Sequence, residues 1–109
     1  MIRPIYSALG QLTRRVKKRF SSRAVILMYH RVAELSSDPW SLAVTPTHFA
    51  DQLAVLRKYG QPISLQQLVQ AHENGRVPHR SIVLTFDDGY ADNLLYAKPL
   101  LEQFDIPAT

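Results

Sequence analysis

Two short apolar runs constrain the fold of this 109-residue chain more than any other feature. Residues 24–29 and 81–86 are almost continuous apolar stretches with several β-branched side chains, and each gives way at once to polar residues. A run of this length and composition predicts a strand that is buried on both faces. Such strands are typical of a parallel sheet, so we expect both runs to belong to one sheet that helices cover.

The segment between the two runs carries the signals of two helices. Thr45-Pro46 predicts a helix start, because the hydroxyl caps free N–H groups and proline fits the first turn. Apolar residues recur at helical spacing over residues 46–59, and we expect Gly60 to end this helix in the left-handed conformation. Ser64 then predicts the cap of a second helix, which ends near Gly75.

Helical spacing resumes after the second run, over residues 91–104. Pro99 interrupts it, and a proline must either kink a helix or begin a new first turn. Strand, helices, strand and helix in this order indicate an α/β architecture with a parallel sheet. Active sites in such folds gather at the carboxyl ends of the strands, where we expect His30 and the pair Asp87-Asp88 to lie.

A basic amphipathic arm, residues 1–22, is predicted to precede the α/β body, residues 23–109. Residues 1–33 hold eight basic residues and no acidic one, whereas the rest of the chain holds five basic and nine acidic residues. The net charges of these two stretches are therefore +8 and −4, and six of the eight basic residues lie in residues 1–22, so the basic character belongs mainly to the arm. Apolar residues repeat along the arm at the helical period, which predicts a helix that either lies on an anionic membrane surface or packs on the body. We expect no nucleic-acid partner.

The arm lacks the residue order of a secretory signal. Its basic cluster follows a mixed segment, whereas a signal peptide needs an uninterrupted apolar stretch after its charges. The longest apolar run, residues 24–29, is far too short to span a bilayer. These features predict neither a cleaved signal peptide nor a transmembrane helix, and they favour a cytoplasmic or peripheral membrane location.

The pair Asp87-Asp88 is the strongest candidate for chemistry. The chain has no cysteine, so histidine and carboxylate side chains must hold any metal. Successive side chains of a strand point to opposite faces, so one carboxylate just past a strand end can hold a metal while the other takes a proton from water. Gly89 supplies the backbone freedom for a sharp turn. The alternative is that both acids merely cap the following helix.

The segment Thr85-Phe86-Asp87-Asp88-Gly89-Tyr90 resembles the first catalytic motif of the polysaccharide deacetylase family, also called the NodB homology domain or carbohydrate esterase family four. Residues 25–32 resemble the family's first strand, residues 45–65 the helix and short segment that follow, and residues 100–109 the stretch before its next strand. The resemblance covers residues 24–109. It implies the N-terminal portion of a distorted (β/α) barrel, truncated in this chain.

By this resemblance, Asp87 is the general base and Asp88 a ligand of a divalent metal, with zinc expected, in the hydrolysis of N-acetyl groups on an amino-sugar polysaccharide. The family completes its metal site with two histidines in a later His-x-x-x-His motif. No two histidines of this chain have that spacing: they are His30, His48, His72 and His79. A single histidine without a partner is expected to be structural, and this holds for His30 as well.

The missing histidines lead to three interpretations. The first is a deacetylase by resemblance whose chain is an incomplete, inactive fragment. The second is a non-catalytic membrane-associated or interaction protein that keeps a deacetylase-like scaffold. The third uses Asp87-Asp88 to hold magnesium for phosphoryl chemistry, and it ranks last because no glycine-rich phosphate loop with its lysine accompanies the acids.

Overall fold

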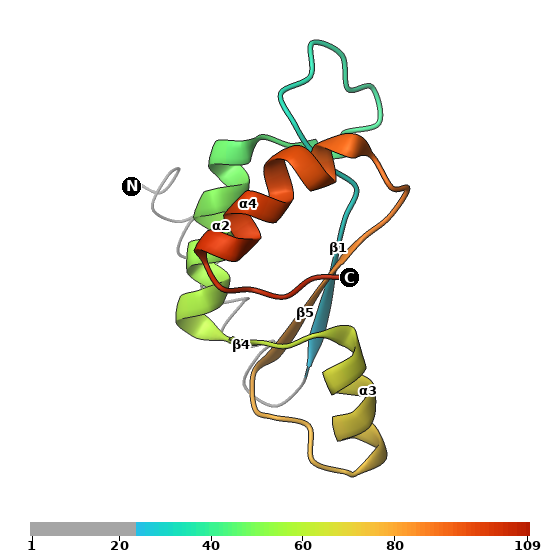
Figure 1. Ribbon diagram of the computed structural model, residues 1–109, viewed down its shortest axis with the longest axis vertical. Coiled ribbons are helices and arrows are strands. Elements are labelled where there is room, and N and C mark those ends of the chain that lie inside the picture. Colours follow the sequence, from blue (N-terminus) through green and yellow to red (C-terminus); the bar gives the residue numbers. More distant parts are fainter. Residues whose placement is uncertain (1–23) are drawn as a thin grey trace, which may run out of the picture.

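The computed structural model describes residues 24–109, so the predicted basic arm, residues 1–22, lies outside the described residues. Figure 1 shows α2 and α4 toward one end of the molecule and α3 at the opposite end, with β1 and β5 between them. The alternation of strands and helices confirms the predicted α/β class. No helix of the described part of the chain is long and apolar enough to cross a membrane. The elements follow in the order β1 (Val25–Tyr29), β2 (Arg31–Val32), β3 (Ala43–Val44), α2 (Pro46–Tyr59), β4 (Gln61–Pro62), α3 (Leu65–Glu73), β5 (Ser81–Phe86), η1 (Asn93–Ala97) and α4 (Lys98–Gln103).

β5 is the central strand of a parallel three-stranded sheet with the order β1-β5-β4. β1 pairs with β5 along its whole length, so that Tyr29 lies opposite Phe86 at the carboxyl end. β4 pairs only with the start of β5, and an isolated bridge farther along joins Leu84 to Ala108. The two apolar runs therefore belong to one parallel sheet, as the sequence predicts, and the structure makes them direct neighbours.

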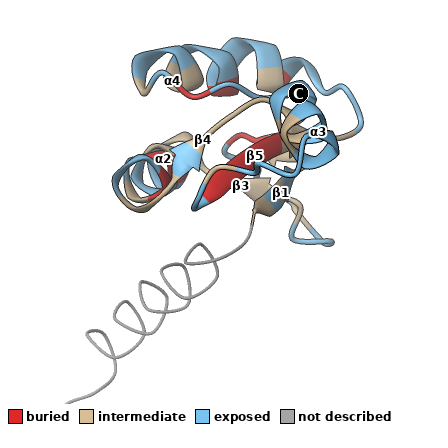
Figure 2. Cartoon of the chain, turned by 90° about the horizontal axis from the view of Figure 1, so that it is seen from below, coloured by how far each residue is buried: buried red, intermediate tan, exposed pale blue. Residues whose placement is uncertain are grey.

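The two paired strands differ in burial. The first four residues of β5 are buried, which confirms the prediction of a strand covered on both faces (Figure 2). In β1 the burial alternates, and Ile26 and Met28 are 55% and 60% exposed. The prediction is therefore wrong for β1. This strand lies at the edge of the sheet, and only the face that carries Val25, Leu27 and Tyr29 packs against the core.

The core lies between the sheet and the helices α2, η1 and α4. α2 contributes Phe49, Leu53 and Leu56, whose spacing places them on one face of the helix. β5 contributes Ile82 and Leu84, which are fully buried. Burial of each such side chain stabilises the fold by roughly 1.5–3 kcal/mol. α2 and the central strand are therefore the main anchors of the region that carries the site.

An aromatic cluster lies where β1 and β5 end. The ring centroids of Tyr29 and Phe86 are 5.5 Å apart, and that of Phe49 lies 5.0 Å from Tyr29 and 6.0 Å from Phe86. Such ring pairs contribute about 0.5–1.5 kcal/mol each beyond their burial. The cluster joins the carboxyl ends of the two strands. His30 is the first residue after β1, and Asp87 is the first residue after β5.

Helix α2 ends at Tyr59, as predicted, but Gly60 does not adopt the predicted left-handed conformation. Its φ of −137° and ψ of 178° are extended. Glycine is required there by a close approach instead, because a Cβ on residue 60 would lie 2.6 Å from Ile82 Cγ1. The absence of a side chain at Gly60 therefore lets the end of α2 lie directly against the central strand.

The other helix signals are confirmed with one addition. Ser64 Oγ accepts a hydrogen bond from Gln67 N at 3.1 Å, and the Gln67 side chain accepts one from Ser64 N at 2.8 Å, which is a complete capping box. Pro99 lies in the first turn of α4, the second of its two predicted roles. The five residues before α4 form a π-helix, η1, which the sequence did not predict. The wider turn suits a proline that lacks an N–H and would clash with a carbonyl of the preceding α-helical turn.

Candidate active site

The turn after β5 carries the candidate residues on an unusual backbone. Asp87 N donates to Tyr29 O at 3.0 Å, which extends the β1–β5 pairing by one step. Asp88 and Gly89 then both have left-handed conformations, with φ of 72° and 60°. This conformation costs an L-residue about 1–2 kcal/mol, and such strain concentrates at functional sites. The turn, rather than the strand alternation that we predicted, therefore sets the direction of the Asp88 side chain.

His30 lies beside Asp88, across the ends of the two neighbouring strands. Its Nδ1 is 3.4 Å from Asp88 Oδ2, and the two side chains are 31% and 53% exposed. The sequence signal for this contact is the position of His30 directly after β1, at the predicted edge. From the sequence His30 was expected to be a structural residue, because no second histidine has the spacing of a metal-binding pair. In the structure its contact with Asp88 makes it part of the candidate site.

Asp87 is half-buried, and its carboxylate makes no hydrogen bond or ion pair within residues 24–109. η1 likewise has no side-chain cap, and neither Asp87 nor Asp88 accepts a hydrogen bond from a backbone N–H of the described residues. The alternative in which the two acids only cap a helix is therefore not supported. The Asp87 carboxylate is left free to accept a proton from another group.

The donors at this edge fit a zinc site in part. A carboxylate from Asp88 and an imidazole from His30 are both groups that zinc binds, but catalytic zinc ordinarily has three protein ligands. Residues 24–109 contain no group of three or more histidine or acidic side chains that could hold a metal ion. The three other histidines are exposed and do not join the site: His48, His72 and His79.

Burial perturbs one titratable group near the site. The side chain of Tyr29 lies in the aromatic cluster, and burial raises the pKa of its phenol from 10.0 to about 12. Its hydroxyl donates to Gln52 Oε1 at 2.8 Å. Tyr29 therefore stays neutral at physiological pH. Its contacts with Gln52 and Phe86 hold the end of β1, next to His30.

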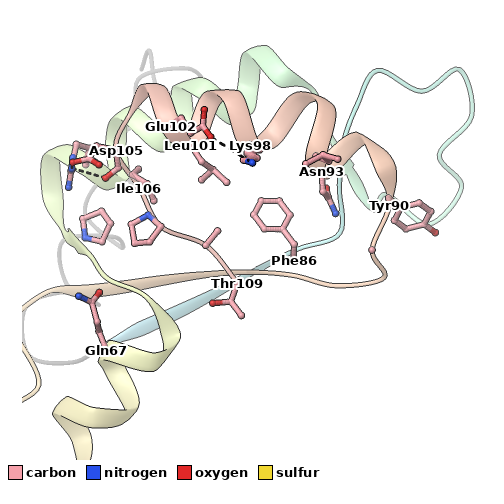
Figure 3. A pocket seen from close by; sticks show the side chains of 16 residues that line it. Gln67, Phe86, Tyr90, Asn93, Lys98, Leu101, Glu102, Asp105, Ile106 and Thr109 are labelled. Atoms are coloured by element: carbon pink, nitrogen blue, oxygen red, sulfur yellow. Dashed lines mark hydrogen bonds and ion pairs between the residues drawn. The ribbon is translucent and has the colours of Figure 1, made fainter.

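A groove of about 890 Å³ runs from the turn after β5 along α4 to the end of the described chain. Figure 3 shows Tyr90 and Asn93 toward one end, Asp105 toward the other, and Lys98 and Glu102 on α4. Lys98 pairs with Glu102, and Asp105 pairs with Arg57, which also lines the groove. Asp87 and Asp88 are not among the residues that line it. The groove therefore borders the turn that carries the candidate residues, through Phe86, Gly89 and Tyr90.

Sequence comparison places the chain among deacetylases, although no family model matches it. A poly-beta-1,6-N-acetyl-D-glucosamine N-deacetylase of Escherichia coli K12 is 36% identical over 86 residues, which cover 77% of this chain and 13% of that protein. The enzyme of the same name in Staphylococcus epidermidis is 30% identical over 101 residues, covering 79% and 34%. The chain thus spans about a third or less of the curated relatives that it matches.

Solved structures agree with these relatives. IcaB from Ammonifex degensii has a TM-score of 0.67 and 28% identity, over 80% of this chain and 36% of that one. The deacetylase PplD of Streptococcus pyogenes, solved in complex with acetate, has a TM-score of 0.69 and 32% identity, over 76% and 39%. In sequence and in fold, the chain therefore belongs to the polysaccharide deacetylase family and corresponds to the N-terminal part of its NodB homology domain.

Proposed function

We propose that this chain is the part of a polysaccharide N-deacetylase that carries the general base, Asp87, and one metal ligand, Asp88. The observation that carries the proposal is the turn after β5, where a free carboxylate and a partly exposed one follow each other at the carboxyl end of the central strand. Similarity to several deacetylases across this region supports the assignment.

The two carboxylates have different tasks in the proposed reaction. A divalent metal, for which zinc is the best candidate, would lower the pKa of a water molecule bound to it and polarise the acetyl carbonyl. Asp88 would hold that metal with its outward-facing carboxylate. Asp87, whose carboxylate has no partner within residues 24–109, would accept the proton of the attacking water. His30 would contact Asp88 and keep its carboxylate in place.

The described residues do not supply a complete site. Asp88 and His30 provide two donors at most, whereas catalytic zinc ordinarily takes three protein ligands. We therefore propose that the remaining ligands and the acid for the leaving amine come from residues outside 24–109. On this proposal residues 24–109 bind metal weakly and do not catalyse deacetylation alone.

The names of the curated relatives suggest the substrate class. Both are N-deacetylases of poly-beta-1,6-N-acetyl-D-glucosamine. We propose that this chain serves a reaction on the same class of polymer, in which water hydrolyses the amide of an N-acetylglucosamine unit. The products are acetate and a free amine on the sugar.

A chimera tests the proposed function. In this chimera the matching segment of the E. coli deacetylase is replaced by residues 24–109 of the present chain, and acetate release from poly-beta-1,6-N-acetyl-D-glucosamine oligomers is measured. The chimera should release one acetate for each amine formed, while the isolated 109-residue chain at the same concentration should release none. An unmodified E. coli enzyme serves as the reference for folding and activity.

Two results would contradict the proposal. A folded chimera without acetate release would show that residues 24–109 do not carry a working base and ligand. Turnover by the isolated chain would instead refute the claim that the described residues hold an incomplete site. Loss of the fold in the chimera is recognised by circular dichroism, and a second chimera with the Staphylococcus epidermidis enzyme then provides the same test.

A further inference from the structure

Two side chains next to the turn reach back to the main chain that carries His30. Asn93, the first residue of η1, donates from Nδ2 to His30 O at 3.2 Å. Asp92, the residue before it, accepts from Val32 N through Oδ2 at 3.0 Å, in a buried position. We call these two side chains the clamp. Their bonds fix the main chain on the carboxyl side of His30.

The amino side of His30 is fixed as well. Tyr29 O accepts from Asp87 N at 3.0 Å, so the residue before His30 is bonded to the residue before Asp88. The clamp follows Asp88 by only a few residues in the sequence. The segment 87–93 thus holds the chain on both sides of His30, and the 3.4 Å contact between His30 and Asp88 lies between these bonds.

Arg31 strengthens the clamp. Its Nη2 donates to Asp92 Oδ1 at 3.2 Å, and Asp92 is only 8% exposed. The guanidinium also lies 4.2 Å from the ring centroid of Tyr90, which brings the other side of the turn into the same network. A charge-assisted bond in a largely buried place is stronger than a neutral one, so Asp92 has little freedom to move.

Two polar side-chain atoms of this network are buried without a hydrogen-bond partner among the described residues. Arg31 Nε and Asn93 Oδ1 are the buried side-chain nitrogen and oxygen atoms of residues 24–109 that have no hydrogen-bond partner. A buried polar atom without a partner costs free energy. The network therefore includes a local cost beside the site, and proteins accept such costs most often where a structure serves a site.

We infer that Asp92 and Asn93 are positioning residues, which act on the site by holding the His30 main chain so that its imidazole lies against the Asp88 carboxylate. The catalytic meaning of this role rests on the proposed function, but the role itself does not. The pairing of β2 with β3 still holds Arg31 and Ala33 when the clamp is removed. The main chain at His30 then loses its bonds to Asp92 and Asn93, and the contact between His30 and Asp88 is no longer fixed from the side of the turn.

Nitrogen NMR of the histidine rings in the metal-free 109-residue chain tests the inference at one fixed alkaline pH. Asp88→Asn should shift the His30 ring resonances in the otherwise unchanged chain. In the Asn93→Ala background the same substitution should shift them no more than it shifts those of exposed His48. A His30 response that keeps its full size in the Asn93→Ala background overturns the inference.

Asp92→Asn provides a second background with the same expected loss of response. If this variant fails to fold because its buried ion pair is broken, the Asn93→Ala result decides alone. Asp105→Asn is the matched control, since it alters the exposed pair with Arg57 and should leave the His30 response unchanged. A loss of response in this control as well would show a general loosening and would also overturn the inference.

The E. coli chimera separates this inference from the proposed function. There Asn93→Ala should lower kcat with little change in KM, whereas Asp105→Asn should change neither. An inactive chimera whose NMR response follows the clamp would refute the proposed function and leave the positioning role intact. An active chimera in which Asn93→Ala leaves kcat unchanged would refute the positioning role.

Discussion

Replacing Asp88 with glycine should stabilise the protein while it removes the proposed metal ligand. Asp88 has a φ of 72°, a conformation that costs an L-residue about 1–2 kcal/mol and costs glycine almost nothing. Glycine in turn loses about 0.5–1 kcal/mol more backbone entropy on folding. The contact with His30 is long and partly exposed, so its loss changes the balance little. The expected net gain is about 0.5–1 kcal/mol in the free energy of unfolding.

Urea denaturation of the metal-free 109-residue chain, followed by far-ultraviolet circular dichroism, measures this gain. Tryptophan fluorescence is a poor probe because Trp40 is 80% exposed in the folded state. A gain of this size corresponds to an increase of about 2–8 °C in Tm for a domain this small. In the E. coli chimera the same substitution should abolish acetate release.

Asp105→Gly is the matched control, since Asp105 also has a left-handed backbone, with a φ of 53°, and its side chain is 98% exposed. It should raise the stability by a similar amount and leave acetate release unchanged. An ordinary destabilising mutation lowers the free energy of unfolding by about 1 kcal/mol. If Asp88→Gly lowers it by that much or more, the turn is not strained at Asp88. Acetate release that survives Asp88→Gly would refute the role of Asp88 as a ligand.

Two further predictions concern the frame around the site. Gly60→Ala should destabilise the chain by about 1–3 kcal/mol in urea denaturation, because the new Cβ meets the buried Ile82 side chain. An unchanged urea midpoint would show that the end of α2 does not lie this close to β5. Burial raises the pKa of the Tyr29 phenol from 10.0 to about 12. The folded state therefore keeps its full stability below pH 10 and loses stability as the pH rises from 10 toward 12, where the phenol ionises more easily in the unfolded chain. Tyr29→Phe should remove up to about 2–3 kcal/mol of that alkaline loss, measured as the difference between the two stability–pH curves, and identical curves would contradict it.

The sequence predicted the parts of the fold that local chemistry determines. The apolar composition of residues 24–29 and 81–86 was enough to predict two strands of one parallel sheet, and Ser64 marked a helix start correctly. For Pro99 the sequence left a kink and a first turn open, and the structure has the first turn. The exposure of one face of β1 was not predictable from its residues. β1 and β5 are both apolar, and they differ in burial because β5 is central in the sheet and β1 lies at its edge.

Tertiary contacts explain what was missed. Gly60 was correctly placed at the end of α2, but the reason for glycine is the side chain of Ile82, which is distant in sequence. The sequence predicted that the pair Asp87-Asp88 and His30 lie at the carboxyl edge of the sheet, and the structure places them there. The contact of His30 with Asp88 depends on the β1–β5 register, which no local pattern reveals.

The central claim is that Asp87 accepts a proton and that Asp88 holds the metal. Paired measurements of zinc affinity and acetate release in the E. coli chimera test it most directly. Asp87→Asn should keep the zinc affinity and lower kcat by about 10²–10⁴-fold, the usual contribution of a general base. Asp88→Asn should lose zinc and turnover together, with the fold intact because asparagine adopts the left-handed conformation at about the same cost as aspartate. Full zinc affinity in Asp88→Asn, or undiminished kcat in Asp87→Asn, would contradict the account.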